Sequence, residues 1–363
     1  MLKRIPFVAA VALLTIWPAV RADDKAVAFP FKDGDRVAWI GSSSTNIGVW
    51  PRTMEFLLRT RNPDVHLTFH KFSTGGGTFA TGAEKLDGWL ADFKPTLVFL
   101  NYGGNDAAAG EAGLPQFKEN MEKCVAKVEA AGARVVLVTP QAADVRKSGE
   151  EAAANRRLYA ETMLAFAKEK GWPVVDTHHP LETLQREGEK ADKDFTINKD
   201  KIHLTDPGYV AWGCFLYERL TPPACECKAV LTADGKTTAT TRCKVEDVKA
   251  EAGTLSFVRR DEVLPILPPA ALLPPRGPVP LEKLSPYLLA VTGLPDGNYE
   301  ILCEDKPIGE ATASRLAEGV NLNTLLLDSG KPAPWAELAE QLWAGKGLDQ
   351  IGATRWRFAV RKK

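Results

Sequence analysis

The sequence predicts an α/β fold, in which helices cover both faces of a parallel sheet, followed by a smaller β-rich region. Two observations carry this prediction. Up to about residue 220, apolar runs of strand length alternate with segments of helical periodicity. After that point, short alternating stretches and proline-rich connections replace the helical pattern. Strands that alternate with helices form parallel sheets, because each crossover helix packs back onto the sheet.

The elements of the α/β part follow one another in a regular order. Glycine or proline bounds several of them: Gly132 ends a helical pattern and Pro140 stops a strand. Ligand sites in such sheets lie beyond the carboxyl ends of the strands, so the ends of the predicted strands are the places to search. We expect strands at 36–40, 65–72, 96–101, 134–139 and 173–176, and helices at 50–61, 83–93, 114–131, 150–170 and 208–220.

The N-terminus has the features of a secretory signal. Lys3 and Arg4 precede an apolar run over residues 5–20, and Val20-Arg21-Ala22 offers small residues at the two positions that a signal peptidase reads. We therefore expect residues 1–22 to be a signal peptide, a mature chain that starts at Asp23, and an exported protein, periplasmic or secreted. An uncleaved N-terminal anchor is the alternative. The formal net charge is zero, which gives no basic excess for nucleic-acid binding.

Four polar clusters stand at predicted strand ends or before the last helix of the α/β part. The topology brings all four to one edge of the sheet. They are Gly41-Ser42-Ser43-Ser44-Thr45, Ser73-Thr74-Gly75-Gly76-Gly77-Thr78, Gly103-Gly104-Asn105-Asp106 and Asp200-Lys201-Ile202-His203.

These residue types suit acyl transfer. A serine on a strand-to-helix turn is exposed and can attack a carbonyl, while a histidine takes its proton and a carboxylate orients that histidine. Glycine N–H groups and an Asn amide can hydrogen-bond the oxyanion that forms. His203 is the histidine placed for this task. His66 and His70 lie on a strand pattern, and His178 and His179 follow a strand end without a serine that would explain them.

The four clusters, in this order, resemble the signature blocks of the GDSL/SGNH hydrolases. The resemblance covers roughly residues 34 to 220 and implies the SGNH hydrolase fold, a flavodoxin-like three-layer α/β/α sandwich with a parallel sheet, over residues 23–222. It implies a catalytic triad of Ser43, His203 and Asp200. The same resemblance implies an oxyanion hole formed by the Ser43 N–H, Gly76 and Asn105. Neither a metal nor an organic cofactor is expected.

The chain departs from the family pattern at two positions. Ser42 stands where the family usually has Asp, and Gly77 replaces the usual Asp of the second block. The Asp that Ser42 replaces is not a triad member in the family, so we expect a serine ester hydrolase that acts on small acyl esters through an acyl-enzyme. Export favours O-acetyl groups of carbohydrates as substrates.

Several alternatives remain open at this point. A lysophospholipase or thioesterase of the same family is one. A catalytically degenerate binding protein with the same fold is the second, and Ser42 and Gly77 motivate it. The third is a flavodoxin-like flavin binder, in which residues 41–46 would hold a phosphate. We expect a small-molecule or carbohydrate ester as the partner, with no nucleic acid and no stable membrane insertion after processing; the oligomeric state stays open.

The last part of the chain, residues 223–363, predicts a β-rich extension. A proline-rich stretch at 264–280 indicates a linker or irregular connection, and we expect a helix at 334–344 and a closing strand at 356–360. Trp335, Trp343 and Trp356 are candidates to face a sugar, although such residues are more often core.

The six cysteines divide by position. Cys124 and Cys214 lie in helical patterns and are expected to be buried thiols. In an oxidising compartment, the other four can form one or two disulfides, with three connectivities possible for the four. A Cys-x-Cys zinc site is not favoured, because no histidine lies nearby. These four are Cys225, Cys227, Cys243 and Cys303.

Overall fold

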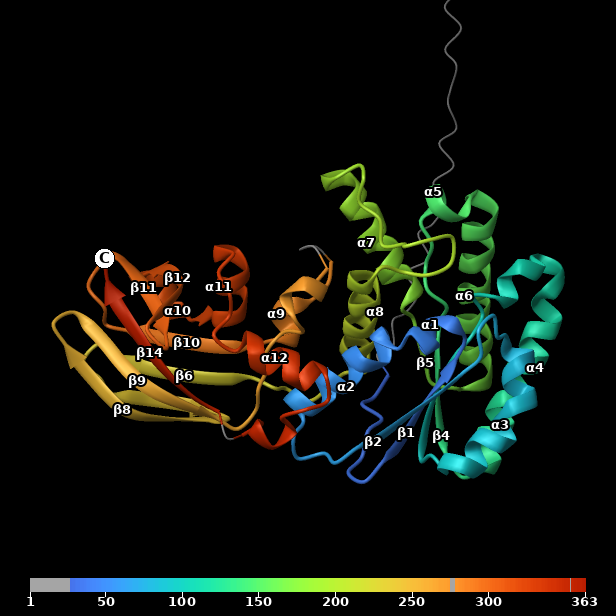
Figure 1. Ribbon diagram of the computed structural model, residues 1–363, viewed down its shortest axis with the longest axis horizontal. Coiled ribbons are helices and arrows are strands. Elements are labelled where there is room, and N and C mark those ends of the chain that lie inside the picture. Colours follow the sequence, from blue (N-terminus) through green and yellow to red (C-terminus); the bar gives the residue numbers. More distant parts are fainter. Residues whose placement is uncertain (1–26, 275–277, 353) are drawn as a thin grey trace, which may run out of the picture.

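The computed structural model describes residues 27–274, 278–352 and 354–363. The predicted signal peptide and its cleavage point before Asp23 lie outside the described residues. The α/β part and the β-rich part lie side by side along the long axis of the molecule (Figure 1). None of the helices in the described ranges has the length and apolar character needed to cross a membrane.

The α/β part is built on a five-stranded sheet with the order β2-β1-β3-β4-β5. Every neighbouring pair in this sheet is parallel. The predicted parallel sheet is thus confirmed, and β1 and β3 lie at its centre, where both faces are buried. The strands are β1 (Arg36–Gly41), β2 (Thr68–Ser73), β3 (Leu97–Asn101), β4 (Arg134–Val138) and β5 (Val174–Val175).

Helices cover both faces of this sheet, and the alternation of side chains along β1 explains how. Val37 and Trp39 point to one apolar core, and Ala38 and Ile40 point to the other. The first core is closed by α2 (Val49–Arg61), α7 (His178–Ala191) and α8 (Asp206–Arg219). The second is closed by α3 (Phe79–Phe93), α4 (Leu114–Ala130) and α6 (Glu150–Lys170). Two short helices, α1 (Ser43–Ile47) and α5 (Val145–Ser148), follow β1 and β4.

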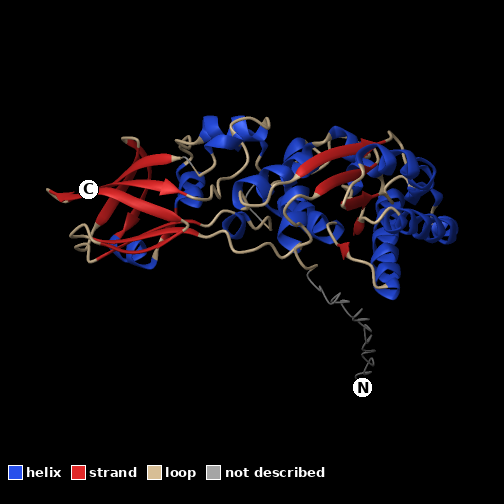
Figure 2. Ribbon diagram, turned by 90° about the horizontal axis from the view of Figure 1, so that it is seen from below, coloured by secondary structure: helices blue, strands red, loops and turns tan. Residues whose placement is uncertain are grey.

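The C-terminal part contains two further sheets, which confirms the expected β-rich region (Figure 2). The first has the order β13-β10-β6-β7, and its β6–β10 pair is parallel. The second has the order β12-β11-β14-β9-β8 and is antiparallel throughout. Their strands are β6 (Cys227–Thr232), β7 (Thr237–Thr241), β8 (Cys243–Glu251), β9 (Thr254–Asp261), β10 (Tyr287–Thr292), β11 (Asn298–Cys303), β12 (Lys306–Thr312), β13 (Val320–Asn321) and β14 (Arg355–Lys362).

In the described residues, four α-helices accompany these two sheets. They are α9 (Leu281–Leu284), α10 (Ala313–Glu318), α11 (Leu322–Ser329) and α12 (Ala336–Trp343). The last of them agrees with the helix expected at 334–344, and β14 agrees with the closing strand expected at 356–360. Trp335 is 3% exposed, and Trp343 and Trp356 pack against the apolar core. Trp335 is therefore a core residue, whereas Trp343 and Trp356 are half-buried and their sugar-facing role stays a prediction.

The junction between the two parts is buried, and the proline-rich stretch runs through it. Arg61, at the end of α2, is fully buried and donates from Nε to the carbonyl of Leu284 and from Nη2, at 2.8 Å, to that of Ile266. Leu264 N–H donates to the Thr60 carbonyl at 2.9 Å. The stretch is irregular, as expected, but it is packed rather than a free linker.

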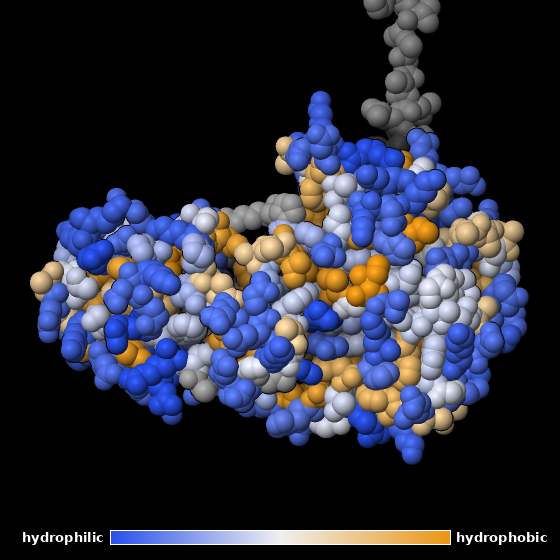
Figure 3. Space-filling view, in the orientation of Figure 1, coloured by the Kyte–Doolittle hydropathy of each residue, from blue (hydrophilic) through white to orange (hydrophobic). Residues whose placement is uncertain are grey.

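Apolar surface gathers near the middle of the face shown in Figure 3.

The cysteines agree in part with expectation. All six cysteines are buried free thiols in this structure, which confirms the prediction for Cys124 and Cys214, while the disulfides possible among the other four stay a prediction. Trp50 belongs to the core of the α/β part. It is fully buried between Trp39 and Trp212, with ring centroids 5.5 and 5.6 Å away.

Candidate active site

The turn after β1 presents three consecutive serines. Gly41 ends the strand, and a Cβ at this position would lie 2.6 Å from the carbonyl oxygen of Asn101 on β3, so only glycine fits. Ser42 is the N-cap residue of α1, with extended backbone and no capping bond from its side chain. Its carbonyl accepts from Asn46 N–H at 3.0 Å and closes the first turn. Ser43 is thereby the first residue of the helix.

Only one of the three serines contacts the predicted base. Ser43 is half-buried, and its Oγ lies 3.0 Å from Nε2 of His203. Ser44 is 1% exposed, and its Oγ instead accepts from Gln141 Nε2 at 3.1 Å. The Ser42 side chain is largely buried at the N-cap. The geometry therefore favours Ser43 over its two neighbours as a nucleophile.

His203 and Asp200 form the second link of the chain. Nδ1 of His203 lies 3.0 Å from Oδ2 of Asp200. The other carboxylate oxygen accepts from the backbone N–H groups of His203 at 2.7 Å and Ile202 at 2.8 Å. These two N–H bonds, first that of His203, lower the pKa of Asp200 to about 2. Asp200 is thus a fixed carboxylate that holds the imidazole with Nε2 toward Ser43.

The second and third clusters meet beside this chain. Asn105 Nδ2 donates to the Gly77 carbonyl at 2.9 Å, which uses one of its two amide hydrogens. Its side chain makes no helix-capping bond, so the plain capping interpretation is not supported. Gly76 has φ +69°, a left-handed conformation that favours glycine, and space is open around it. Asp106 accepts from Phe79 N–H at 3.0 Å and Gly103 N–H at 2.9 Å, and burial raises its pKa.

Three side chains that the sequence did not single out hold the loop that carries Asp200 and His203. Asn198 Nδ2 lies 3.4 Å from the Asp200 carbonyl, Arg156 Nη2 donates to Lys201 at 2.9 Å, and Gln141 Nε2 donates to Ile202 at 3.1 Å. The three acceptors are consecutive carbonyls. Gln141 also bonds Ser44, so one buried amide joins the helix of Ser43 to the loop of His203. No local sequence pattern marks such contacts.

We expect Gln141→Leu to lower kcat by about 10- to 100-fold with little change in KM. Leucine has a similar volume but cannot donate to Ser44 and Ile202, so the Ser43–His203 distance loses its support, and small misplacements of reacting groups cost this much. Steady-state kinetics on p-nitrophenyl acetate and a melting curve would measure the effect. Gln116→Leu, on the exposed face of α4, is the matched control. Equal kinetics for the two variants would show that Gln141 does not position Ser43 and His203.

The remaining histidines have other partners. His178 is buried, its Nδ1 lies 3.1 Å from the Pro140 carbonyl, and burial lowers its pKa to about 4. His179 Nδ1 lies 2.8 Å from Oδ2 of Asp176, a bond that raises the pKa of the imidazole. His66 pairs with Asp33 at the surface. Within the described residues, none of these histidines hydrogen-bonds a serine, which agrees with the choice of His203.

The fold and this site define a class. A parallel α/β/α sandwich with a Ser–His–Asp hydrogen-bond chain at the carboxyl edge of its sheet has the architecture of SGNH-type ester hydrolases. Residues 34–211 match the GDSL-like Lipase/Acylhydrolase family, and the chain therefore carries a domain that belongs to this family.

Individual relatives agree with this assignment. Esterase TesA of Pseudomonas aeruginosa is 39% identical over 66 residues, which are 18% of this chain and 32% of that esterase. This chain thus matches only about a third of the length of that relative. A solved structure described as BT4096, a gut microbial diltiazem-metabolizing enzyme, has a TM-score of 0.72 at 18% identity and covers 94% of this chain and 100% of its own. The shared fold therefore includes the β-rich part.

The acetylxylan esterase Axe2 of Geobacillus stearothermophilus is a more distant neighbour. Its solved structure has a TM-score of 0.42 at 16% identity and covers 52% of this chain and 93% of its own.

Proposed function

We propose that this protein is a serine ester hydrolase in which Ser43, His203 and Asp200 form the catalytic triad. The observation that carries the proposal is the hydrogen-bond chain from Ser43 Oγ through the two nitrogens of His203 to Asp200, with both distances at 3.0 Å. Nucleophile, base and orienting carboxylate are within hydrogen-bond reach of one another, which is the geometric criterion for such a triad.

The mechanism follows from this geometry. Ser43 Oγ attacks the ester carbonyl carbon while His203 Nε2 accepts its proton, and the proton then passes to the leaving alcohol. Asp200, charged at all ordinary pH values, stabilises the imidazolium. The Ser43 N–H, Gly76 N–H and the second Asn105 amide hydrogen would stabilise the oxyanion. Water, activated by His203, then releases the acid from the Ser43 acyl-enzyme. This sequence of steps requires neither a metal nor an organic cofactor.

We propose that the protein is exported and that residues 1–22 are its signal peptide. For the substrate, we propose an O-acetyl group on a carbohydrate. The half-exposed Asp200 and its exposed neighbour Lys201 support this, since an open, polar rim suits a hydrated alcohol. A second candidate is an ester with a longer acyl chain, as in a lysophospholipase. Three exposed aliphatic side chains favour it, because they lie on the elements around the triad: Ile47, Val145 and Ile202.

The test is a fluorophosphonate label followed by an ester series. We expect wild type to take one label and Ser43→Ala to take none. On p-nitrophenyl esters of rising chain length and on acetylated xylo-oligosaccharides, a preference for acetate supports the carbohydrate proposal. A rise with chain length favours the second candidate. A folded wild-type protein, without the colour of a bound flavin, that neither takes the label nor hydrolyses any ester would contradict the hydrolase proposal.

Ser42→Asp separates an active enzyme from a degenerate binding protein. We expect the variant to keep activity within about tenfold of wild type, because the triad does not use residue 42. A carboxylate there also lies at a helix N-terminus, where negative charge is stabilised. If wild type is inert and Ser42→Asp gains both label and turnover, the natural chain is a binding protein.

We expect Asn105→Ala to lower kcat by about a hundredfold while KM changes little. The amide meets negative charge that develops only in the transition state, and one such donor contributes ~3 kcal/mol. Single-turnover kinetics on p-nitrophenyl acetate would measure it. Since Asn105 also bonds the Gly77 carbonyl, a melting curve must accompany the kinetics. An unchanged kcat would leave Asn105 with a purely structural role in joining the two loops.

A further inference from the structure

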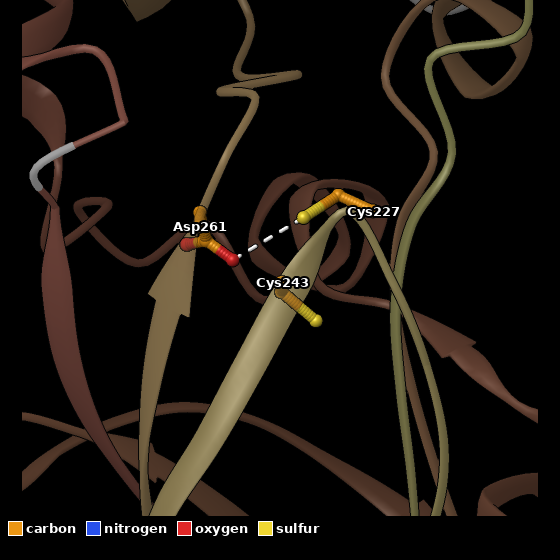
Figure 4. A group of neighbouring side chains, drawn as sticks. All are labelled: Cys227, Cys243 and Asp261. Atoms are coloured by element: carbon orange, nitrogen blue, oxygen red, sulfur yellow. Dashed lines mark hydrogen bonds between the residues drawn. The ribbon is translucent and has the colours of Figure 1, made fainter.

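A buried cluster in the β-rich part brings two cysteines together from different sheets. Cys227 begins β6 in one sheet, and Cys243 begins β8 in the other, next to Asp261 at the end of β9 (Figure 4). The two sulfur atoms and one carboxylate oxygen all lie within 4.8 Å of one another. The cysteines are 0% and 3% exposed, and Asp261 is 1% exposed.

The thiol contacts show how closely the two strands approach. The Cys227 thiol lies 3.3 Å from the carbonyl of Arg242, the residue just before Cys243. The Cys243 thiol lies 3.1 Å from the carbonyl of Lys228, the residue just after Cys227. Each sulfur thus reaches the peptide group beside the other cysteine. Because the two sulfur atoms also lie within 4.8 Å of one another, a change of side-chain rotamer can bring them to bonding distance.

The charges around the pair do not favour a metal ion. The guanidinium of Arg259 lies 3.0 Å from the Cys227 sulfur and donates to Oδ1 of Asp261 at 2.7 Å. Tyr287 donates to the other carboxylate oxygen at 2.6 Å. Both oxygens of Asp261 therefore already accept hydrogen bonds, and the positive charge of Arg259 beside the Cys227 sulfur opposes the binding of a divalent ion.

The two thiols have different acidities. The hydrogen bond from Cys227, followed by the charge of Arg259, lowers the pKa of Cys243, while the same pairing and burial raise the pKa of Cys227. Thiol–disulfide exchange requires a thiolate that attacks a disulfide and a second thiol that then resolves the mixed disulfide. Cys243 suits the first role and Cys227 the second.

We propose that Cys227 and Cys243 form a disulfide that joins the two C-terminal sheets when the chain folds in an oxidising compartment. The Cys243 thiolate attacks one sulfur of a small-molecule disulfide and releases its other half as a thiolate. Cys227 then loses its proton to solvent and displaces the second half. Two protein thiols are oxidised, and the small-molecule disulfide is reduced to two thiols. Cys225 and Cys303 stay reduced.

The proposal selects one of the connectivities that the sequence leaves open, and it does not depend on the function proposed for Ser43. Because Cys243 follows Cys227 by only sixteen residues, the link closes a short loop. Such a loop still constrains the unfolded chain, and we expect the melting temperature to rise by roughly 5–10 °C on oxidation.

The experiment refolds the full chain in a buffer of reduced and oxidised glutathione, blocks remaining thiols in denaturant, and maps tryptic peptides by mass spectrometry. Trypsin releases Leu220–Lys228, which contains both Cys225 and Cys227, so the mapping is repeated with Cys225→Ser. We expect four of the six cysteines to be blocked in wild type and three of the five in the variant. Residues 220–228 should be linked to Cys243-Lys244, with the mass of two hydrogens lost.

Matched variants supply the second readout. Cys303→Ser, another buried cysteine of the same part, should keep the rise in melting temperature on oxidation, whereas Cys227→Ser and Cys243→Ser should each lose it. The peptide map of Cys225→Ser decides the matter if Cys227→Ser or Cys243→Ser does not fold. Six blocked cysteines, a link through Cys225 or Cys303, or one bound zinc ion per chain by elemental analysis would each overturn the proposal.

Discussion

Replacing Ser43 by alanine is expected to lower kcat for p-nitrophenyl acetate by about four to six orders of magnitude, without a change in melting temperature. The half-buried hydroxyl contacts His203 and holds no other element in place, so its loss removes the nucleophile and little packing. His203→Ala should cost about as much, and the double variant should lose no more than either single one, because members of a triad act as a unit.

The neighbouring serines are the controls for this prediction. Ser42→Ala should remain active, because its hydroxyl makes no capping bond. Ser44→Ala should show a moderate loss at most, since it removes the acceptor of the Gln141 amide. Near-normal turnover in Ser43→Ala together with loss in either neighbour would show that the nucleophile is assigned wrongly.

Asp200→Asn is expected to lower kcat by about 10⁴-fold with KM nearly unchanged. The amide can donate to Nδ1 of His203, which would place the proton on Nε2 and leave no acceptor for the Ser43 hydroxyl. The backbone N–H groups of Ile202 and His203 can still bond the amide oxygen, so the loop should keep its shape. A crystal structure or a melting curve of the variant is the control, and a loss under tenfold would contradict the role of Asp200.

The pH dependence of Asp200 follows from the direction of its pKa shift. Its pKa in the folded chain, about 2, is below the ordinary 3.8. Its stabilising contribution is therefore fully present above about pH 4 and is lost as pH falls toward 2. Acid unfolding of wild type and Asp200→Asn should converge over this window. Convergence at a higher pH would mean that the carboxylate is not held by the two backbone N–H groups.

The sequence predicted the centre of the fold well because its signals there are local. β1, β3 and β4 are apolar runs that end in glycine, asparagine or proline, and both faces are buried. The four polar clusters were predicted at one edge from topology, and Ser43, Asp200 and His203 do meet. The oxyanion roles of Gly76 and Asn105 remain predictions.

The rest depended on information that is not local. Helix α7 was not predicted, since Pro180 and Gly188 interrupt its pattern. Here Gly188 is required because a Cβ would lie 2.1 Å from the ring of Phe195. Gln141 and Arg156 meet the His203 loop across long sequence separations. The packed path of residues 264–267 likewise depends on Arg61, which no pattern in the proline-rich stretch can reveal.

The buried Arg61 has a consequence for how this chain can be divided. The helix that it ends begins two residues after the helix of Ser43, and its guanidinium depends on carbonyls of Ile266 and Leu284 in the other part. A chain ended at residue 222 would keep the triad but leave a buried cation without its acceptors, and would expose the outer faces of α2 and α8 to water. The β-rich part is therefore not an exchangeable module. A recombination or gene-fusion event that separated the two would have to replace Arg61 and its apolar surroundings at the same time, so the two parts are expected to be inherited together.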